Sequence, residues 1–299
     1  MPQFDDLQWT NNAPVPATYE ANQPRLIGHR RKTDGSDSFA YLSFAEELNV
    51  LNAQSVEPPL FVSYYTKDTP YEALANDLMR SLDKLSLPHR IEPIASTGSW
   101  VANTGLKSGF IAKAWYESDR PICWIDADAE LLRTPGFLFG NPFDIAMVRR
   151  HGWYDMSGLV YLNKTKDAQQ VLDAWVSLCQ SNPEVWDQVL LTIAWYRTAQ
   201  ETELSSMFLN DAIFRFPRPW VRDLRDQLFY YPFKKKMQPF VDQKQASRAL
   251  KDFVNASQIK RNEFGSDDIT KSFRNALKQF DFSHDSEIAS IFNLDTHTD

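Results

Sequence analysis

The stretch that decides the fold is Ile122–Ala129, which reads ICWIDADA: four apolar residues, then two aspartates one residue apart. An apolar run of this length predicts a strand that is buried on both faces, as in the central sheet of an α/β protein. Because residues i and i+2 of an extended chain lie on the same side, the spacing predicts that Asp126 and Asp128 converge. They would lie at the carboxyl end of the strand, where open α/β sheets bind their ligands.

Two neighbouring carboxylates at the end of a buried strand predict a metal site. Burying both charges is costly unless a cation neutralises them. Hard oxygen ligands favour Mg²⁺ or Mn²⁺, which complete their coordination with water and substrate phosphates. Asp126 and Asp128 are therefore expected to hold a divalent metal for a diphosphate. The alternative is that one aspartate caps a following helix and the other is solvated.

The Asp-X-Asp spacing also occurs in Mg²⁺-dependent phosphohydrolases of the haloacid dehalogenase type. In those enzymes the motif usually lies near the start of the domain, with Thr or Val at the fourth position after the first Asp. Here that position is Glu130, and the motif begins only at Asp126. Both departures count against the phosphohydrolase interpretation.

Several segments, in chain order, resemble nucleotide-sugar glycosyltransferases of the GT-A type. The first three are an opening strand (60–65), a helix (71–82) and a Lys-bearing helix (104–113). They are followed by the Asp-X-Asp strand (122–129) and an Asp-Gln pair (187–188). The resemblance implies an α/β fold, a Rossmann-like mixed sheet flanked by helices, with a mostly helical C-terminal region. It also implies metal-dependent transfer of a hexose or pentose from a nucleoside diphosphate sugar, most simply a UDP-sugar.

The resemblance further implies a donor site at the carboxyl end of the sheet. Side chains alternate along the opening strand, so one of Tyr64 and Tyr65 would stack on the nucleobase while the other enters the core. Gly158 would let the backbone approach the sugar closely, and Lys107 rather than Lys113 would reach the donor. The expected donor-binding residues are Tyr64, Tyr65, Thr66, Lys107, Asp126, Gly158 and Gln188.

Catalysis would need a further carboxylate beside the transferred sugar. The resemblance puts Asp187 there, with Asp155 as the alternative. An inverting enzyme would use this group as a general base, and a retaining enzyme would use it to stabilise the cationic sugar or to form a covalent intermediate. The sequence leaves the stereochemistry open. His284 is the third metal ligand that the architecture implies, beside Asp126 and Asp128.

The composition is that of a soluble enzyme, with 299 residues of which 43% are hydrophobic. No stretch approaches the roughly 20 uninterrupted apolar residues of a membrane span. Residues 1–7 have neither the basic nor the apolar part of a secretory signal. The only two cysteines, Cys123 and Cys179, fall in a predicted core strand and a predicted helix. A reduced, cytoplasmic protein with no membrane partner is therefore expected.

Three regions can be distinguished along the chain. Residues 1–58 are rich in proline, with a helical stretch near residues 40–51, and are expected to be an extension packed on the main domain. Residues 59–232 alternate apolar runs with amphipathic helices, as a GT-A catalytic domain would. Residues 233–299 are expected to be helical and part of the same globule.

Charge is unevenly distributed, which bears on the acceptor. The chain as a whole carries −7, which argues against a purely electrostatic nucleic-acid binder. Residues 233–262 nevertheless carry a local net charge of +6. This segment is either a solvated helical face or a surface for an anionic polymer such as modified DNA. A neutral or unidentified acceptor is favoured slightly over DNA.

Two classes of function remain. The first is the metal-dependent glycosyltransferase, and the second is a catalytically inactive module of the same fold that binds a sugar nucleotide or a nucleic acid. The presence of Asp126, Asp128 and the pair Asp187-Gln188 favours the enzyme, because a binding module has less need of all three acids.

Overall fold

The computed structural model describes eight parts of the chain, and three of them, residues 10–11, 25–31 and 37–43, as backbone only. The other described residues are 57–148, 156–183, 185–209, 214–215 and 239–244. The predictions for Asp155, for His284 and for a helical region after residue 244 lie outside the described residues.

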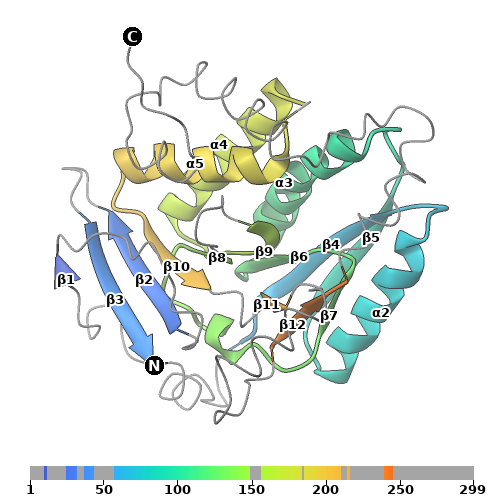
Figure 1. The fold of residues 1–299 in the computed structure, drawn as a ribbon, viewed down its shortest axis with the longest axis horizontal. Coiled ribbons are helices and arrows are strands. Elements are labelled where there is room, and N and C mark those ends of the chain that lie inside the picture. The colour runs from blue at the N-terminus through green and yellow to red at the C-terminus, as the bar shows by residue number, and fades with distance from the viewer. Residues whose placement is uncertain are drawn as a thin grey trace, which may run out of the picture.

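The described strands form one mixed sheet and one small sheet. The large sheet has the order β1-β3-β2-β10-β8-β9-β6-β4-β5 (Figure 1). Strands β4, β5 and β6 are parallel, as are β8 and β10, whereas β9 runs antiparallel between β6 and β8. The strands are β1 (Thr10–Asn11), β2 (Arg25–Arg31), β3 (Asp37–Ser43), β4 (Leu60–Thr66), β5 (His89–Ile94), β6 (Ile122–Ile125), β8 (Ile145–Val148), β9 (Met156–Leu162) and β10 (Ser205–Leu209).

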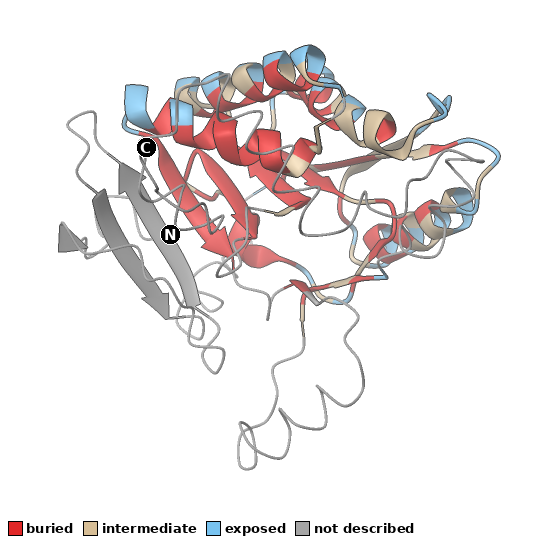
Figure 2. Ribbon diagram, turned by 45° about the horizontal axis from the view of Figure 1, so that its top comes forward, coloured by how far each residue is buried: buried red, intermediate tan, exposed pale blue. Residues whose placement is uncertain are grey.

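Helices cover both faces of this sheet. On one face lie α3 (Trp100–Glu117), α4 (Lys166–Ser181) and α5 (Asp187–Glu201), while α2 (Tyr71–Lys84) packs on the other face beside β4 and β5 (Figure 1). The helices turn their buried residues to the sheet and their exposed residues outward (Figure 2). The predicted mixed α/β sheet flanked by helices is confirmed.

Strand β6 shows why its sequence is apolar throughout. Ile122 and Trp124 belong to the core under α3, α4 and α5, whereas Cys123 and Ile125 belong to the core on the side of α2. All four side chains are buried. A strand with a helical layer on each face has no solvated side, so it needs apolar residues at every position.

Two helices begin directly after a residue whose hydroxyl group caps the first turn. Ser99 accepts a hydrogen bond from the backbone N–H of Ala102 at the start of α3. Thr165 does the same for Ala168 at the start of α4. Each hydroxyl satisfies one of the N–H groups that an α-helix leaves unpaired in its first turn.

The small sheet brings a late segment of the chain against the Asp-X-Asp turn. It has the order β11-β12-β7, formed by Phe214–Arg215, Val241–Gln243 and Ala129–Leu131. Strand β12 runs antiparallel to β7. The pairing is extended at both ends, because Leu132 N–H donates to the Phe240 carbonyl (2.8 Å) and Lys244 N–H to the Asp128 carbonyl (2.9 Å).

Two details of the sequence interpretation are wrong. Residues 40–43 belong to strand β3 and not to a helix. Strand β6 ends at Ile125, so Asp126 and Asp128 lie in a turn, closed by a hydrogen bond from Ala129 N–H to the Asp126 carbonyl (3.0 Å), rather than on an extended chain. None of the described helices is long and apolar enough to span a membrane.

Candidate active site

Asp126 is the meeting point of four elements. Its Oδ1 accepts a hydrogen bond from Trp124 Nε1 (2.8 Å) and lies 3.1 Å from the Lys107 ammonium. Its Oδ2 accepts from Gln243 Nε2 (3.0 Å). Its backbone N–H donates to the Gly158 carbonyl on β9 (3.0 Å). The carboxylate is thereby fixed in place, while 23% of the side chain remains exposed.

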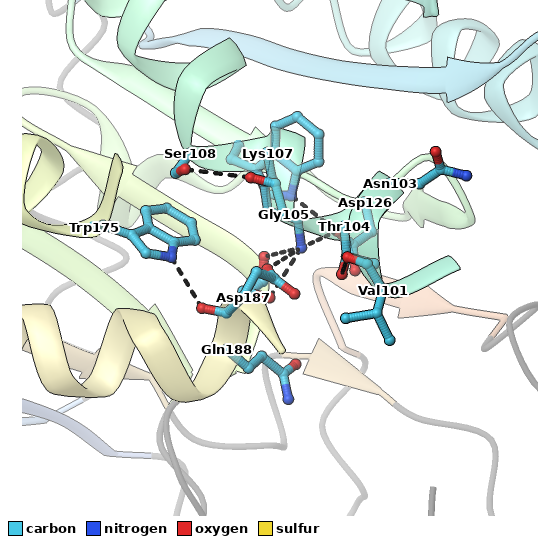
Figure 3. A network of polar contacts seen from close by, with 12 residues as sticks. Val101, Asn103, Thr104, Gly105, Lys107, Ser108, Asp126, Trp175, Asp187 and Gln188 are labelled. Carbon is cyan, nitrogen blue, oxygen red and sulfur yellow. Dashed lines mark hydrogen bonds and ion pairs between the residues drawn. The ribbon is translucent and has the colours of Figure 1, made fainter. Parts of the chain in front are cut away.

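Lys107 lies at the centre of the site. Figure 3 shows its side chain reaching from α3 to a position between Asp126 and Asp187. The Nζ atom is 3.0 Å from Asp187 Oδ2 and donates to Ser157 Oγ (2.9 Å), and it lies 5.3 Å from the centroid of the Trp124 ring. Lys107 is only 5% exposed. Lys107 thus places a positive charge between Asp126 and Asp187.

The surroundings of Lys107 keep its amine protonated. Burial by itself would lower the pKa of the amine, but the nearby charges of Asp126 and Asp187 outweigh it and raise the pKa above its ordinary value of 10.5. The ammonium therefore stays charged through neutral pH. Lys113, on the same helix, is exposed.

Asp187 is the first residue of α5 and is 1% exposed. Its position at the helix N-terminus stabilises a negative charge, because the unpaired N–H groups there carry a partial positive charge. The Trp175 indole donates to its backbone carbonyl (2.9 Å), which anchors the start of α5 on α4 (Figure 3). The carboxylate that was predicted from the Asp-Gln pair is therefore brought within ion-pair distance of Lys107.

Gln243 connects the two aspartates of the Asp-X-Asp turn. Its Nε2 donates to Asp126 Oδ2 (3.0 Å) and to Asp128 Oδ1 (3.3 Å). The charge of Asp128 also reaches Tyr71 at the start of α2: burial, followed by that charge, raises the pKa of the Tyr71 phenol. The two carboxylates thus converge on one point despite lying in a turn.

Gly158 faces this point from β9. A Cβ atom at Gly158 would lie 3.2 Å from Asp126 Oδ2, 3.2 Å from Phe214 Cζ and 3.4 Å from Gln243 Nε2. At these distances a Cβ atom would require its neighbours to shift by a few tenths of an ångström, so glycine suits the close approach of three side chains.

The two tyrosines of β4 point to opposite faces, as alternation requires. Tyr64 packs its ring against Trp124 (5.1 Å between centroids) and Phe110 (5.4 Å), and its hydroxyl donates to the Asn103 carbonyl. Burial, and then the charges of Asp187 and Asp126, raise the pKa of Tyr64, so its phenol is neutral. Tyr65 is half-buried on the other face.

The remaining predicted donor-binding residues lie less centrally. Thr66 is buried at the end of β4, with its Oγ1 3.0 Å from Thr69 Oγ1. The side chain of Gln188 points away from Lys107 (Figure 3).

Sequence reasoning missed two features of this region. The first is Gln243, which no motif marks in a polar part of the sequence. The second is an aromatic group at three helix starts: the Trp100 and Trp186 rings lie 5.7 Å apart, and the Trp100 indole donates to the Tyr71 hydroxyl. Each ring is half-buried. The sequence signal for the second feature is an aromatic residue at the start of each of the three helices, Tyr71 in α2, Trp100 in α3 and Trp186 before α5.

Among the residues that the structure describes, no group of three or more His, Cys, Asp or Glu is placed to share a metal ion. Asp126 and Asp128 meet at the Gln243 amide. A metal there would need its further ligands from other kinds of group.

No protein-family model matches the chain, and no curated protein matches it. Two of the solved structures that are similar to it are glycosyltransferases. One is a glycosyltransferase involved in the glycosylation of the major capsid of PBCV-1, with 14% identity, a TM-score of 0.46, and coverage of 66% of this chain and 99% of that one. The other is the glycosyltransferase GlyE of Streptococcus pneumoniae TIGR4, with 14% identity, a TM-score of 0.41, and coverage of 62% and 54%. At these values neither likeness assigns an activity to this chain.

Proposed function

We propose that this protein is a metal-dependent glycosyltransferase that moves a sugar from a nucleoside diphosphate sugar, most simply a UDP-sugar. The observation that carries the proposal is the set Asp126, Lys107 and Asp187 at the carboxyl end of β6, with Asp128 beside it. Asp126 is partly exposed and Asp187 is buried, and both contact Lys107. Such a pair suits a site that binds a charged leaving group and also needs a catalytic carboxylate.

The side chains present fit a divalent cation. Asp126 and Asp128 offer hard carboxylate oxygens directed at one point, where the Gln243 amide contacts both, and Gly158 adds no side chain of its own. These two aspartates would hold Mn²⁺ or Mg²⁺. When bound, the cation supplies positive charge opposite the departing diphosphate.

Asp187 is the proposed catalytic carboxylate. Its Oδ2 is held by the Lys107 ammonium at 3.0 Å, which fixes the orientation of the side chain. In an inverting reaction the carboxylate would accept the proton of the acceptor hydroxyl, and in a retaining one it would stabilise the cationic sugar or form a bond to it. Lys107 acts through Asp187 and Asp126 and is a positioning residue.

For the donor, the end of β4 is the proposed nucleobase subsite. Tyr65 is the tyrosine available for stacking, because Tyr64 is packed between Trp124 and Phe110. For the acceptor, a neutral hydroxyl compound is the first proposal. Three carboxylates against one lysine make the described part of the site negative, which disfavours a polyanion at the point of transfer. DNA bound through residues 233–262 is the second proposal for the acceptor.

The test is a panel of nucleotide sugars, each assayed for thermal stabilisation of the protein with Mn²⁺ and then for slow donor hydrolysis. A transferase releases a nucleoside diphosphate and free sugar. A phosphohydrolase acting on the same compounds would instead release a nucleoside monophosphate and a sugar 1-phosphate, so the products separate the two activities. An inactive binding module would show stabilisation without either set of products.

The matched variants are Asp128→Asn and Asp119→Asn. Asp128→Asn removes a charge from the turn and should abolish most Mn²⁺-dependent hydrolysis, whereas Asp119 is exposed before β6 and its replacement should change nothing. Equal turnover of Asp128→Asn and the unchanged protein, at saturating donor and Mn²⁺, would falsify the metal assignment.

A further inference from the structure

The amide of Gln243 occupies the point on which the two aspartates converge. Its nitrogen is 3.0 Å from Asp126 Oδ2 and 3.3 Å from Asp128 Oδ1. It bridges both carboxylates at once. In the described residues no third His, Cys, Asp or Glu joins the two aspartates there.

The backbone holds Gln243 firmly at this place. Gln243 pairs with Ala129 directly after the Asp-X-Asp turn, and the next residue, Lys244, donates its backbone N–H to the Asp128 carbonyl (2.9 Å). The Lys244 ammonium binds Asp77 on α2 (2.9 Å). Because side chains alternate along a strand, Val241 and Gln243 point inward, and Gln243 is only 8% exposed. Asp242 lies on the other side of the strand and is half-buried.

The two oxygens of Asp126 have different partners. Its Oδ1 lies beside the Lys107 ammonium and accepts from the Trp124 indole, whereas its Oδ2 accepts from the Gln243 amide. The chain's own cation therefore uses one side of the carboxylate and leaves the other side for a second cation. Gly158 keeps that side open, because a Cβ there would approach Asp126 Oδ2 to 3.2 Å.

A glutamine side chain carries a donor and an acceptor on one rotatable amide. Turning the amide by half a turn exchanges the NH₂ group and the carbonyl oxygen with almost no movement of other atoms. In the described arrangement the NH₂ faces the carboxylates. In the turned arrangement Oε1 would face the same point, and a cation there would meet three hard oxygen ligands.

We propose that Gln243 is the third protein ligand of the Asp126–Asp128 metal site, and that its NH₂ group donates to the two carboxylates when no metal is bound. The inference rests on the proposed function, in that it completes the metal site of that activity. Gln243 binds through its carbonyl oxygen and adds no charge, so the site keeps the two negative charges of its aspartates for a divalent cation.

The experiment measures Mn²⁺ affinity of the full chain by the loss of the free Mn²⁺ signal in electron paramagnetic resonance, without any nucleotide sugar. Gln243→Leu removes the amide and should weaken Mn²⁺ binding about tenfold or more. Gln243→Glu keeps the length and adds a carboxylate, and should tighten binding about tenfold. The control Asp242→Asn changes a charge on the same strand but on its other side, and should stay within about twofold.

Thermal unfolding without metal shows whether each variant folds. If Gln243→Leu does not fold, Gln243→Glu decides alone: tighter Mn²⁺ binding supports the proposal, and unchanged or weaker binding overturns it. Equal affinity of all three variants and the unchanged protein would also overturn it, as would the absence of any Mn²⁺ binding by the unchanged protein. If the affinities shift as expected and no nucleotide sugar is hydrolysed, Gln243 remains a ligand and the transferase proposal fails.

Discussion

Buried aspartates lie at both ends of the large sheet, and their partners differ in kind. At the amino end, before β8, Asp144 accepts hydrogen bonds from neutral groups of the described chain: the N–H (2.8 Å) and hydroxyl (2.5 Å) of Ser205 and the hydroxyl of Thr165 (2.6 Å). At the carboxyl end, after β6, Asp126 and Asp187 share the Lys107 ammonium.

This difference suggests a structural role for Asp144 and a functional role for Asp126 and Asp187. The donors of Asp144 belong to the first residue of β10 and to the N-cap of α4, so this carboxylate holds three elements together and uses nothing charged to do so. A buried ion pair is a poor way to gain stability, because the cost of removing two charges from water offsets their attraction. The Lys107 cluster is therefore better explained by a function that needs charge at this end of the sheet.

The largest effect is expected from Asp187→Asn. The amide keeps the shape of the side chain but cannot accept a proton, so the rate constant for transfer should fall about 10²–10⁴-fold. The Michaelis constant of the donor should change little, because the interaction is made mainly in the transition state. Steady-state kinetics with the donor identified in the nucleotide-sugar panel provides the measurement.

If Asp187→Asn raises only the Michaelis constant, Asp187 is a binding or structural residue and not the catalytic carboxylate. Asp155 would then become the first candidate for the catalytic carboxylate. In that case the contrast between the two ends of the sheet would concern binding and not catalysis.

The second effect is on stability. Lys107→Met keeps the length of the buried side chain and removes the charge, which leaves Asp126 and Asp187 without their shared partner. Breaking a buried pair by removing one partner costs about 3–5 kcal/mol in the free energy of unfolding. Chemical denaturation measures this cost, and Lys113→Met, at an exposed position of the same helix, is the control that should shift it by less than about 0.5 kcal/mol.

If Lys107→Met unfolds like the control, the ammonium contributes no net stability. The two acids would then be well solvated without it, and the argument that Lys107 neutralises them would fail.

The sequence predicted the class of the fold, two strands of the sheet and part of the site. Four apolar residues in a row required helices on both faces of β6, and the structure has them. The two carboxylates of the Asp-X-Asp turn do meet, at the Gln243 amide, and the divalent metal predicted for them stays a prediction. The contacts of Lys107 with Asp126 and Asp187 depend on the packing of α3 and α5 at the end of β6, and a spacing of residues does not contain that information.

Gln243 could not have been predicted, for a related reason. It lies 117 residues after Asp126 in the sequence and reaches it through the pairing of β12 with β7, two strands of three residues each. Strands this short carry no periodic signal. The polar residues around them gave no reason to single out one glutamine.

The smallest effect is expected at the other end of the sheet. Asp144→Asn replaces one acceptor oxygen by an NH₂ group, which cannot accept from Ser205 or Thr165, and one buried hydrogen bond or two should be lost. The free energy of unfolding should fall by about 1–3 kcal/mol. The transfer rate of the folded variant should equal that of the unchanged protein, since Asp144 lies before β8 and the proposed chemistry lies after β6. Denaturation and steady-state kinetics on the same preparation measure both. A lower rate constant with unchanged stability would reverse the assignment of the two ends, because it would give Asp144 a chemical role that its neutral partners do not suggest.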